Sequence, residues 1–134
     1  MISTYQILSF TIGRKNRIVF VSNITPKRKK LVKDLRTLGI PIDCYGKGWE
    51  NKGIYYSDLN LLYNSYKYSL NLCQDIYGFS VRVQQALASG TVVFSDYSKD
   101  ISSFSNLFSN LYIFRDKEDF YKKWENNFNI EYKN

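Results

Sequence analysis

The feature that most constrains the fold of this chain is a regular alternation of short apolar runs with helix-like periodicity. Residues 17–21 (RIVFV) place four apolar residues in a row, which is typical of a strand covered on both faces. The leucines and valine of 31–38 then recur at helical spacing, and Gly39 is a suitable helix stop. Strand and helix continue to alternate in this way to the end of the chain.

The spacing predicts five strands and four main helices. The predicted strands cover 17–21, 40–45, 68–73, 91–96 and 111–114, and residues 4–12 are predicted to add a hairpin strand to the first of them. The predicted helices cover 31–38, 57–66, 80–89 and 116–128, capped at Ser57, Ser80 and Asp116, with one helical turn at 101–104. Short connections between such elements predict an α/β fold: a Rossmann-like, doubly wound, mostly parallel sheet with helices on both faces.

The length of the chain sets the number of domains. With 134 residues it can bury one core as a single domain over 1–134, and it is too short for two lobes facing each other across a cleft. In doubly wound sheets, ligands bind beyond the carboxyl ends of the strands, near the point where strand order reverses. The predicted ligand loops are therefore 22–27, 46–53, 74–79 and 96–100.

The basic character of the chain permits an anionic partner without selecting one. The net charge is +7, and the one tight basic run, PKRKK at 26–30, stands between a buried strand and a helix start. A helix start offers free N–H groups and a positive dipole end, so Lys27 or Arg28 is a candidate for phosphate contact, although the run alone favours a solvated helix face with no role. Nucleic acid is the least favoured partner, because stacking, recognition-helix and zinc-finger patterns are absent.

Two other segments carry candidate ligand contacts. The glycines that flank Lys47 in YGKGW suit either a close approach to a ligand or a plain turn. Ser80 and Arg82, at a helix start, would present N–H groups and a guanidinium to a diphosphate, and Gln85 lies one turn further on. Periodicity alone favours the alternative, in which Arg82 and Gln85 are the polar side of a helix whose other side packs in the core.

The remaining composition points away from metal, disulfide and membrane classes. Cys44 and Cys73 lack the paired spacing of a metal site or a disulfide framework, and the chain contains no His. Signal-peptide patterns and apolar runs of about 18 residues are also absent from the sequence. We therefore expect a cytoplasmic protein with reduced thiols, no membrane span, no bound metal and no cofactor.

Five segments follow one another over about 17–124: RIVFVSNITPKRKKLVKDL, YGKGW, DLNLLYNSYKYSLNL, RVQQALASGTVVFSD and LYIFRDKEDFYKKW. In this order they resemble the C-terminal donor-binding domain of GT-B glycosyltransferases of the CgeB-like (spore maturation protein) type. The resemblance implies a Rossmann-like domain that binds a nucleotide-diphosphate sugar without a metal. It also implies a cleft formed with an N-terminal domain that holds the acceptor, and hexosyl transfer as the reaction.

The resemblance also assigns candidate residues. By position, it implies nucleotide or diphosphate contacts for Arg28, Lys47, Ser80 and Arg82, and a ribose contact for Gln85. The family carries Glu at the position of Gln85, and its carboxylate accepts both ribose hydroxyls. Because Gln has one acceptor oxygen and a donor amide, one hydrogen bond must reverse or be lost. Such a loss costs about 1–3 kcal/mol, on the order of tenfold to a hundredfold in affinity.

No catalytic residue can be assigned, since no side chain can be placed as a base over a donor sugar. The chain is therefore expected to act as the donor half of a glycosyltransferase that needs an acceptor domain, supplied by another protein chain or by a homo-oligomer. Two alternatives stay open. One is a non-catalytic module that keeps the fold to bind a partner protein, and the other is a small nucleic-acid-binding domain that uses Lys27 to Lys30.

Overall fold

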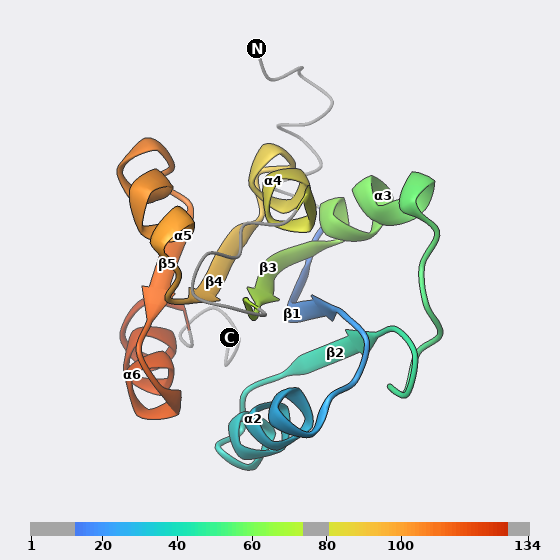
Figure 1. The fold of residues 1–134 in the computed structure, drawn as a ribbon, viewed down its shortest axis with the longest axis horizontal. Coiled ribbons are helices and arrows are strands. Elements are labelled where there is room, and N and C mark those ends of the chain that lie inside the picture. Colours follow the sequence, from blue (N-terminus) through green and yellow to red (C-terminus); the bar gives the residue numbers. More distant parts are fainter. Residues whose placement is uncertain (1–12, 74–80, 129–134) are drawn as a thin grey trace.

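One five-stranded sheet organises the domain. The computed structural model describes residues 13–73 and 81–128. All strand pairs in this part of the chain are parallel, and the order is β2-β1-β3-β4-β5 (Figure 1). The strands are β1 (Lys15–Val21), β2 (Ile42–Tyr45), β3 (Tyr66–Asn71), β4 (Val92–Asp96) and β5 (Leu111–Phe114). Strand order reverses between β1 and β3, which is where ligands bind in sheets of this order.

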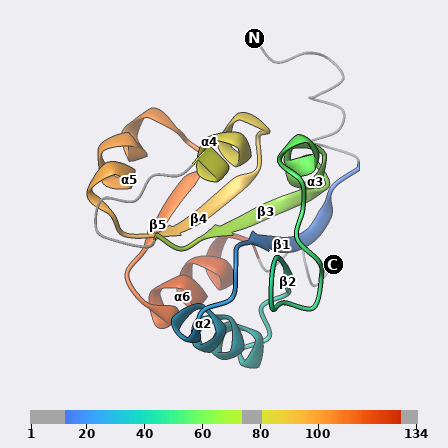
Figure 2. The ribbon, with the colours of Figure 1, turned by 45° about the vertical axis from the view of Figure 1, so that its right-hand side comes forward.

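Helices cover both faces of this sheet, as predicted. On one face lie α2 (Pro26–Thr37) and α6 (Lys117–Asn127), and on the other lie α3 (Leu59–Asn64), α4 (Val81–Ala88) and α5 (Lys99–Phe104) (Figure 2). Two short 3₁₀ turns, η1 (Tyr56–Asp58) and η2 (Ser105–Leu107), precede α3 and follow α5. Each helical layer buries its own cluster of apolar side chains against the sheet. The predicted doubly wound α/β fold is confirmed.

The apolar run of β1 is explained by burial from both sides. Ile18 and Phe20 pack in the cluster under α2 and α6, whereas Val19 packs in the cluster under α3 and α4. All three are at most 2% exposed. Because successive side chains of a strand point to opposite faces, a strand covered twice must be apolar at every position.

The helix boundaries follow local capping chemistry. In α2, Pro26 occupies the first turn and the Thr25 hydroxyl accepts the N–H of Arg28, and the helix ends before Gly39, whose φ is 87°. In α6, the carboxylate of Asp116 accepts the N–H of Asp119, which confirms the predicted cap. These caps fix the first turns of α2 and α6 at the carboxyl edge of the sheet.

The predicted helix over 57–66 is wrong in two respects. Asp58, not Ser57, is at the N-cap, and it makes no side-chain capping bond. Tyr66 belongs to β3, because the chain already pairs with β1 there and the Tyr66 hydroxyl donates to Asp43 Oδ2 at 2.7 Å. A Tyr three residues after Tyr63 suits a helix face and a strand start equally, so periodicity could not separate them. The predicted strand at 4–12, the Ser80 cap and the loop at 74–79 lie outside the described residues.

Two further observations concern the predicted thiols and the predicted lack of a membrane span. Cys44, in β2, and Cys73, after β3, are not joined by a disulfide. None of the helices within 13–73 and 81–128 combines the length and the apolar character that crossing a membrane requires.

The turn after β2 packs against the loop after β1 through its glycines. Gly46 has a φ of 140°, and a Cβ there would stand 2.0 Å from the Ser22 carbonyl oxygen. Gly48 has a φ of 92°, and a Cβ there would stand 2.2 Å from Cγ2 of Ile24. The glycines of YGKGW therefore allow a close approach between two parts of the protein itself.

Replacing Gly46 tests how strongly this contact holds the two loops. We expect Gly46→Ala to lower the free energy of unfolding by about 2–3 kcal/mol, because the methyl group meets fixed backbone at an unfavourable φ. Urea denaturation measures the change. Gly53→Ala is the matched control, since a Cβ there meets nothing within 4 Å. Equal effects of the two substitutions would contradict the assigned contact.

Candidate functional site

The segment after β1, residues 22–25, lies at the carboxyl edge of the sheet and is called the β1 loop here. Its backbone is tied to the turn after β2: Ser22 N–H donates to Tyr45 O and Ile24 N–H donates to Lys47 O, both at 2.9 Å. These bonds hold the β1 loop in place beside the point where strand order reverses.

Cationic residues from three elements contact β1 and its loop. Arg28, in the first turn of α2, donates from Nη1 to Asn23 O at 3.0 Å. Arg82, in the first turn of α4, lies with Nη1 3.4 Å from Val21 O. Lys47 contributes its carbonyl to Ile24, and its side chain is exposed. The structure thus brings Arg28, Lys47 and Arg82 together around one short stretch of backbone.

Gln85 follows Arg82 by three residues on α4, so the two share a helix face. Its side-chain oxygen, Oε1, is buried and receives no hydrogen bond within the described part of the chain. The other face of α4 packs in the core through Val83, Ala86 and Leu87, as the periodicity predicted. A buried polar atom without a partner is unusual in a folded protein, and Trp49 Nε1 is another such atom within the described residues.

Two further residues bear on this region: Ser80, which the sequence predicted as a contact, and Tyr63, which it did not. Ser80 lies outside the described residues. Tyr63, in α3, is buried, and this burial raises the pKa of its phenol to about 12, while the nearby Arg82 guanidinium acts in the opposite direction. Sequence reasoning placed Tyr63 only on an apolar helix face, because nothing in the spacing indicates that Arg82 approaches it.

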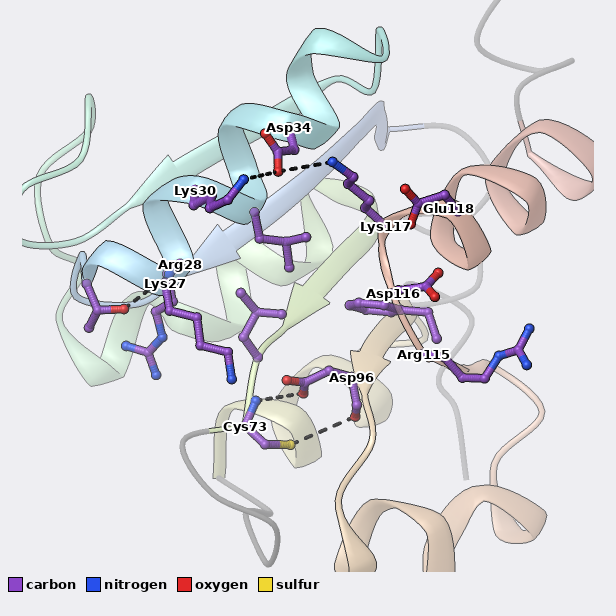
Figure 3. A pocket seen from close by; sticks show the side chains of 14 residues that line it. Lys27, Arg28, Lys30, Asp34, Cys73, Asp96, Arg115, Asp116, Lys117 and Glu118 are labelled. Carbon is purple, nitrogen blue, oxygen red and sulfur yellow. Dashed lines mark hydrogen bonds and ion pairs between the residues drawn. The ribbon is translucent and has the colours of Figure 1, made fainter.

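A cavity of about 640 Å³ opens on the other side of Arg28 (Figure 3). It lies between the first turns of α2 and α6 and is bounded by the ends of β3, β4 and β5. Leu31, Leu72 and Phe114 give it an apolar lining. The predicted ligand loops 22–27 and 96–100 reach this cavity, but its wall at residues 115–118 was missed by sequence reasoning.

Asp96, the last residue of β4, places a partly buried carboxylate in this cavity. Cys73 N–H donates to Oδ1 of this carboxylate at 2.8 Å. Burial raises the pKa of Asp96, whereas the Cys73 N–H and the charge of Lys27 act against that rise. In Figure 3 the Lys27 side chain extends from α2 toward Asp96 and Cys73.

An ion pair fixes the far wall of the cavity. Asp34 of α2 accepts from Lys30 at 3.0 Å and from Lys117 of α6 at 3.5 Å. The hydrogen bond from Lys30 holds the pKa of Asp34 below its usual range. The bond from Lys117 links two helices of one layer across this wall of the cavity. No group of three His, Cys, Asp or Glu side chains suited to a metal ion occurs within 13–73 and 81–128.

Because burial raises the pKa of Asp96, its ionised carboxylate is expected to lower the stability of the folded state at neutral pH. Near pH 3 Asp96 is protonated in both the folded and unfolded states, so it contributes nothing. As pH rises through the ordinary Asp value, the unfolded state ionises first, and the folded state loses stability until pH exceeds the raised value. We therefore expect Asp96→Asn to raise the Tm at pH 7 and to leave it unchanged near pH 3, because the amide oxygen can still accept from Cys73.

Thermal melting between pH 3 and pH 8 checks this expectation. Asp100→Asn is the matched control, because Asp100 is exposed in the first turn of α5 and should give no such gain. If the Tm of Asp96→Asn at pH 7 is equal to or below that of the unmodified chain, the ionised Asp96 carboxylate does not destabilise the fold, and the expectation is wrong.

Comparison with known families gives a match to most of the chain. A family model described as glycosyl transferase-like matches residues 27–128. No curated protein sequence gives a significant match. The matched segment runs from the first turn of α2 through α6, and thus includes Arg28, Lys47, Arg82, Gln85 and Asp96. Because the match covers well over half of the chain, this protein belongs to the glycosyl transferase-like family.

Proposed function

We propose that this domain binds a nucleotide-diphosphate sugar as the donor half of a glycosyltransferase. The observation that carries the proposal is Gln85: a buried side-chain acceptor with no donor among the described residues, on the helix whose first turn brings Arg82 to the end of β1. A ligand hydroxyl would satisfy that acceptor. The family assignment supports a nucleotide sugar as the proposed ligand class.

The diphosphate is proposed to lie over the β1 loop. The first turns of α2 and α4 both begin at the carboxyl edge of the sheet, where helix ends carry partial positive charge. Arg28 and Arg82 each use one terminal nitrogen on a backbone carbonyl, so further guanidinium N–H groups are available to phosphate oxygens. Lys47 can add a third, mobile cation, and Ser80 remains a predicted contact at the start of α4.

The ribose is proposed to lie at Gln85, one turn into α4. The amide oxygen can accept from one ribose hydroxyl, whereas a carboxylate could accept from both. The site is therefore expected to bind its nucleotide less tightly than a site with Glu at this position.

Cations at the diphosphate stabilise the leaving group during sugar transfer, since charge develops there as the glycosidic bond breaks. We propose that this domain supplies that stabilisation. The acceptor and any base would come from a second domain, provided by another chain or by a second copy of this one. The narrower assignment to the CgeB-like type, hexosyl transfer and a cytoplasmic location belong to this proposal.

Gln85→Glu tests the ribose contact. We expect it to increase affinity for the cognate nucleotide by about tenfold to a hundredfold, because the second hydroxyl gains an acceptor. Isothermal titration with UDP, GDP, ADP and CMP measures the dissociation constants. Gln84→Glu is the matched control, since it adds the same charge to the same helix at an exposed position and should change affinity little.

Arg82→Met provides the opposite test and should weaken binding of the same nucleotide. If none of the four nucleotides binds either the unmodified chain or Gln85→Glu, the donor proposal is wrong. The alternative of a non-catalytic protein-binding module would then be favoured.

A further inference from the structure

A second cavity, of about 490 Å³, lies beside α2 and is called the Trp49 cavity here. One wall is formed by α2 residues between 29 and 37, the other by the turn after β2 at 48–50, and Ile24 of the β1 loop also lines it. It shares no lining residue with the cavity of about 640 Å³, and none of the residues proposed to bind the donor lines it. A ligand held here would therefore be separate from the nucleotide sugar.

Two exposed lysines of α2, Lys29 and Lys33, line the Trp49 cavity. In the part of the chain that the structure describes, neither ammonium group makes a hydrogen bond or an ion pair. Lys30 differs, because it pairs with Asp34. Like charges four residues apart on a helix repel each other, so an anion bound at both lysines is favourable.

Glu50, the one carboxylate among the described residues that line this cavity, does not neutralise the two lysines. Its Oε2 accepts from Arg36 Nη2 at 2.6 Å and from the Cys44 N–H at 2.9 Å. Arg36 also donates to the Ile42 carbonyl from Nη2 at 2.8 Å. Glu50 and Arg36 are thus bound to each other and to the edge of β2, and the charges of Lys29 and Lys33 remain for a ligand.

An aromatic ring lies in the same cavity as these lysines. Trp49 meets Phe20 edge-on, with an interplanar angle of 65°, and no aromatic ring of the described residues stacks on the indole. Its Nε1 is buried and donates to no acceptor in that part of the chain. Ile24 and Val32 add apolar surface beside the ring. The cavity therefore combines two cations with a planar apolar group.

We propose that the Trp49 cavity binds a single strand of nucleic acid, with Lys29 and Lys33 on its phosphates and Trp49 against one base. Sites for single strands combine cations along the backbone with aromatic rings on which bases stack. The two lysines stand about 6 Å apart along the axis of α2, a span that neighbouring phosphates of a flexible strand can bridge. A run of acidic residues would offer the charge without the ring.

This inference goes beyond the proposed function and does not depend on it. Sequence reasoning disfavoured nucleic acid because no motif joins basic and aromatic residues. The fold supplies that combination from two separate elements, since the lysines belong to α2 and Trp49 follows β2.

Fluorescence anisotropy of the full chain with labelled oligothymidylate and oligouridylate tests the inference. We expect saturable binding that weakens as salt rises from about 50 to 200 mM. Lys29→Gln combined with Lys33→Gln should weaken binding and flatten the slope of log K against log salt by about 1.4, because each phosphate contact of a single strand contributes about 0.7. Lys99→Gln combined with Lys122→Gln is the matched control, since it removes the same charge at exposed positions outside the cavity and should change the slope little.

Trp49→Leu tests the ring. Leucine keeps an apolar side chain next to Phe20 but offers no surface for stacking, so we expect about tenfold weaker binding with an unchanged salt slope. Urea denaturation shows whether this variant folds, and the exposed lysine variants provide the test even if it does not.

Three results would overturn the inference. The first is that the unmodified chain binds neither strand. The second is that the Lys29 and Lys33 double variant keeps its full affinity and slope, or changes no more than the control, because the strand would then bind elsewhere. The third is that polyglutamate binds as tightly as the strands and with the same dependence on these lysines, because the surface would then accept any polyanion. A flattened slope confined to the Lys29 and Lys33 variant, with weak binding of polyglutamate, supports the inference.

Discussion

Burial of β1 between two helical layers is the constraint on which the rest of the structure depends. Successive side chains in the centre of β1 point alternately to the two helical layers. The backbone of β1 pairs with β2 on one side and with β3 on the other. A strand desolvated on all sides must have its backbone hydrogen-bonded and its side chains apolar. The carboxyl end of β1 is therefore fixed, and the β1 loop starts from a rigid point.

A small number of contacts connect the candidate site to this rigid strand. The close approach of Gly46 to Ser22 locks the β1 loop to the turn after β2. Arg28 and Arg82 then reach this backbone from opposite faces of the sheet, and the ion pair between Asp34 and Lys117 links α2 to α6. Preorganised cations at a fixed backbone suit an anionic ligand, because little reorganisation is needed when it binds.

The sequence was informative where one local rule determines the outcome. Continuous apolar runs identified the five strands, Gly39 and Asp116 marked a helix end and a helix start, and the alternation gave the parallel sheet. It failed at Tyr66, where helical spacing competes with strand pairing to β1, a contact between distant residues. Local periodicity contains no information on such a contact.

The site was only partly predictable for the same reason. Positions at helix starts and strand ends indicated Arg28, Lys47, Arg82 and Gln85, but not that Gln85 buries an acceptor without a donor. The cavity brings the first turns of α2 and α6 together, although these lie about 90 residues apart in the sequence. Only the strand order, which places β5 beside β4, makes that wall of the cavity possible.

The most direct test of the central claim is an NMR titration of the ¹⁵N-labelled chain with UDP, GDP and ADP, following each backbone amide. The account predicts saturable shifts for one nucleotide, concentrated at the β1 loop and at the first two turns of α4. An absence of shifts with all three nucleotides would contradict it. So would shifts confined to exposed residues in the second half of α2, such as Lys33, because Lys33 lies away from the β1 loop and outside the cavity that Asp96 lines.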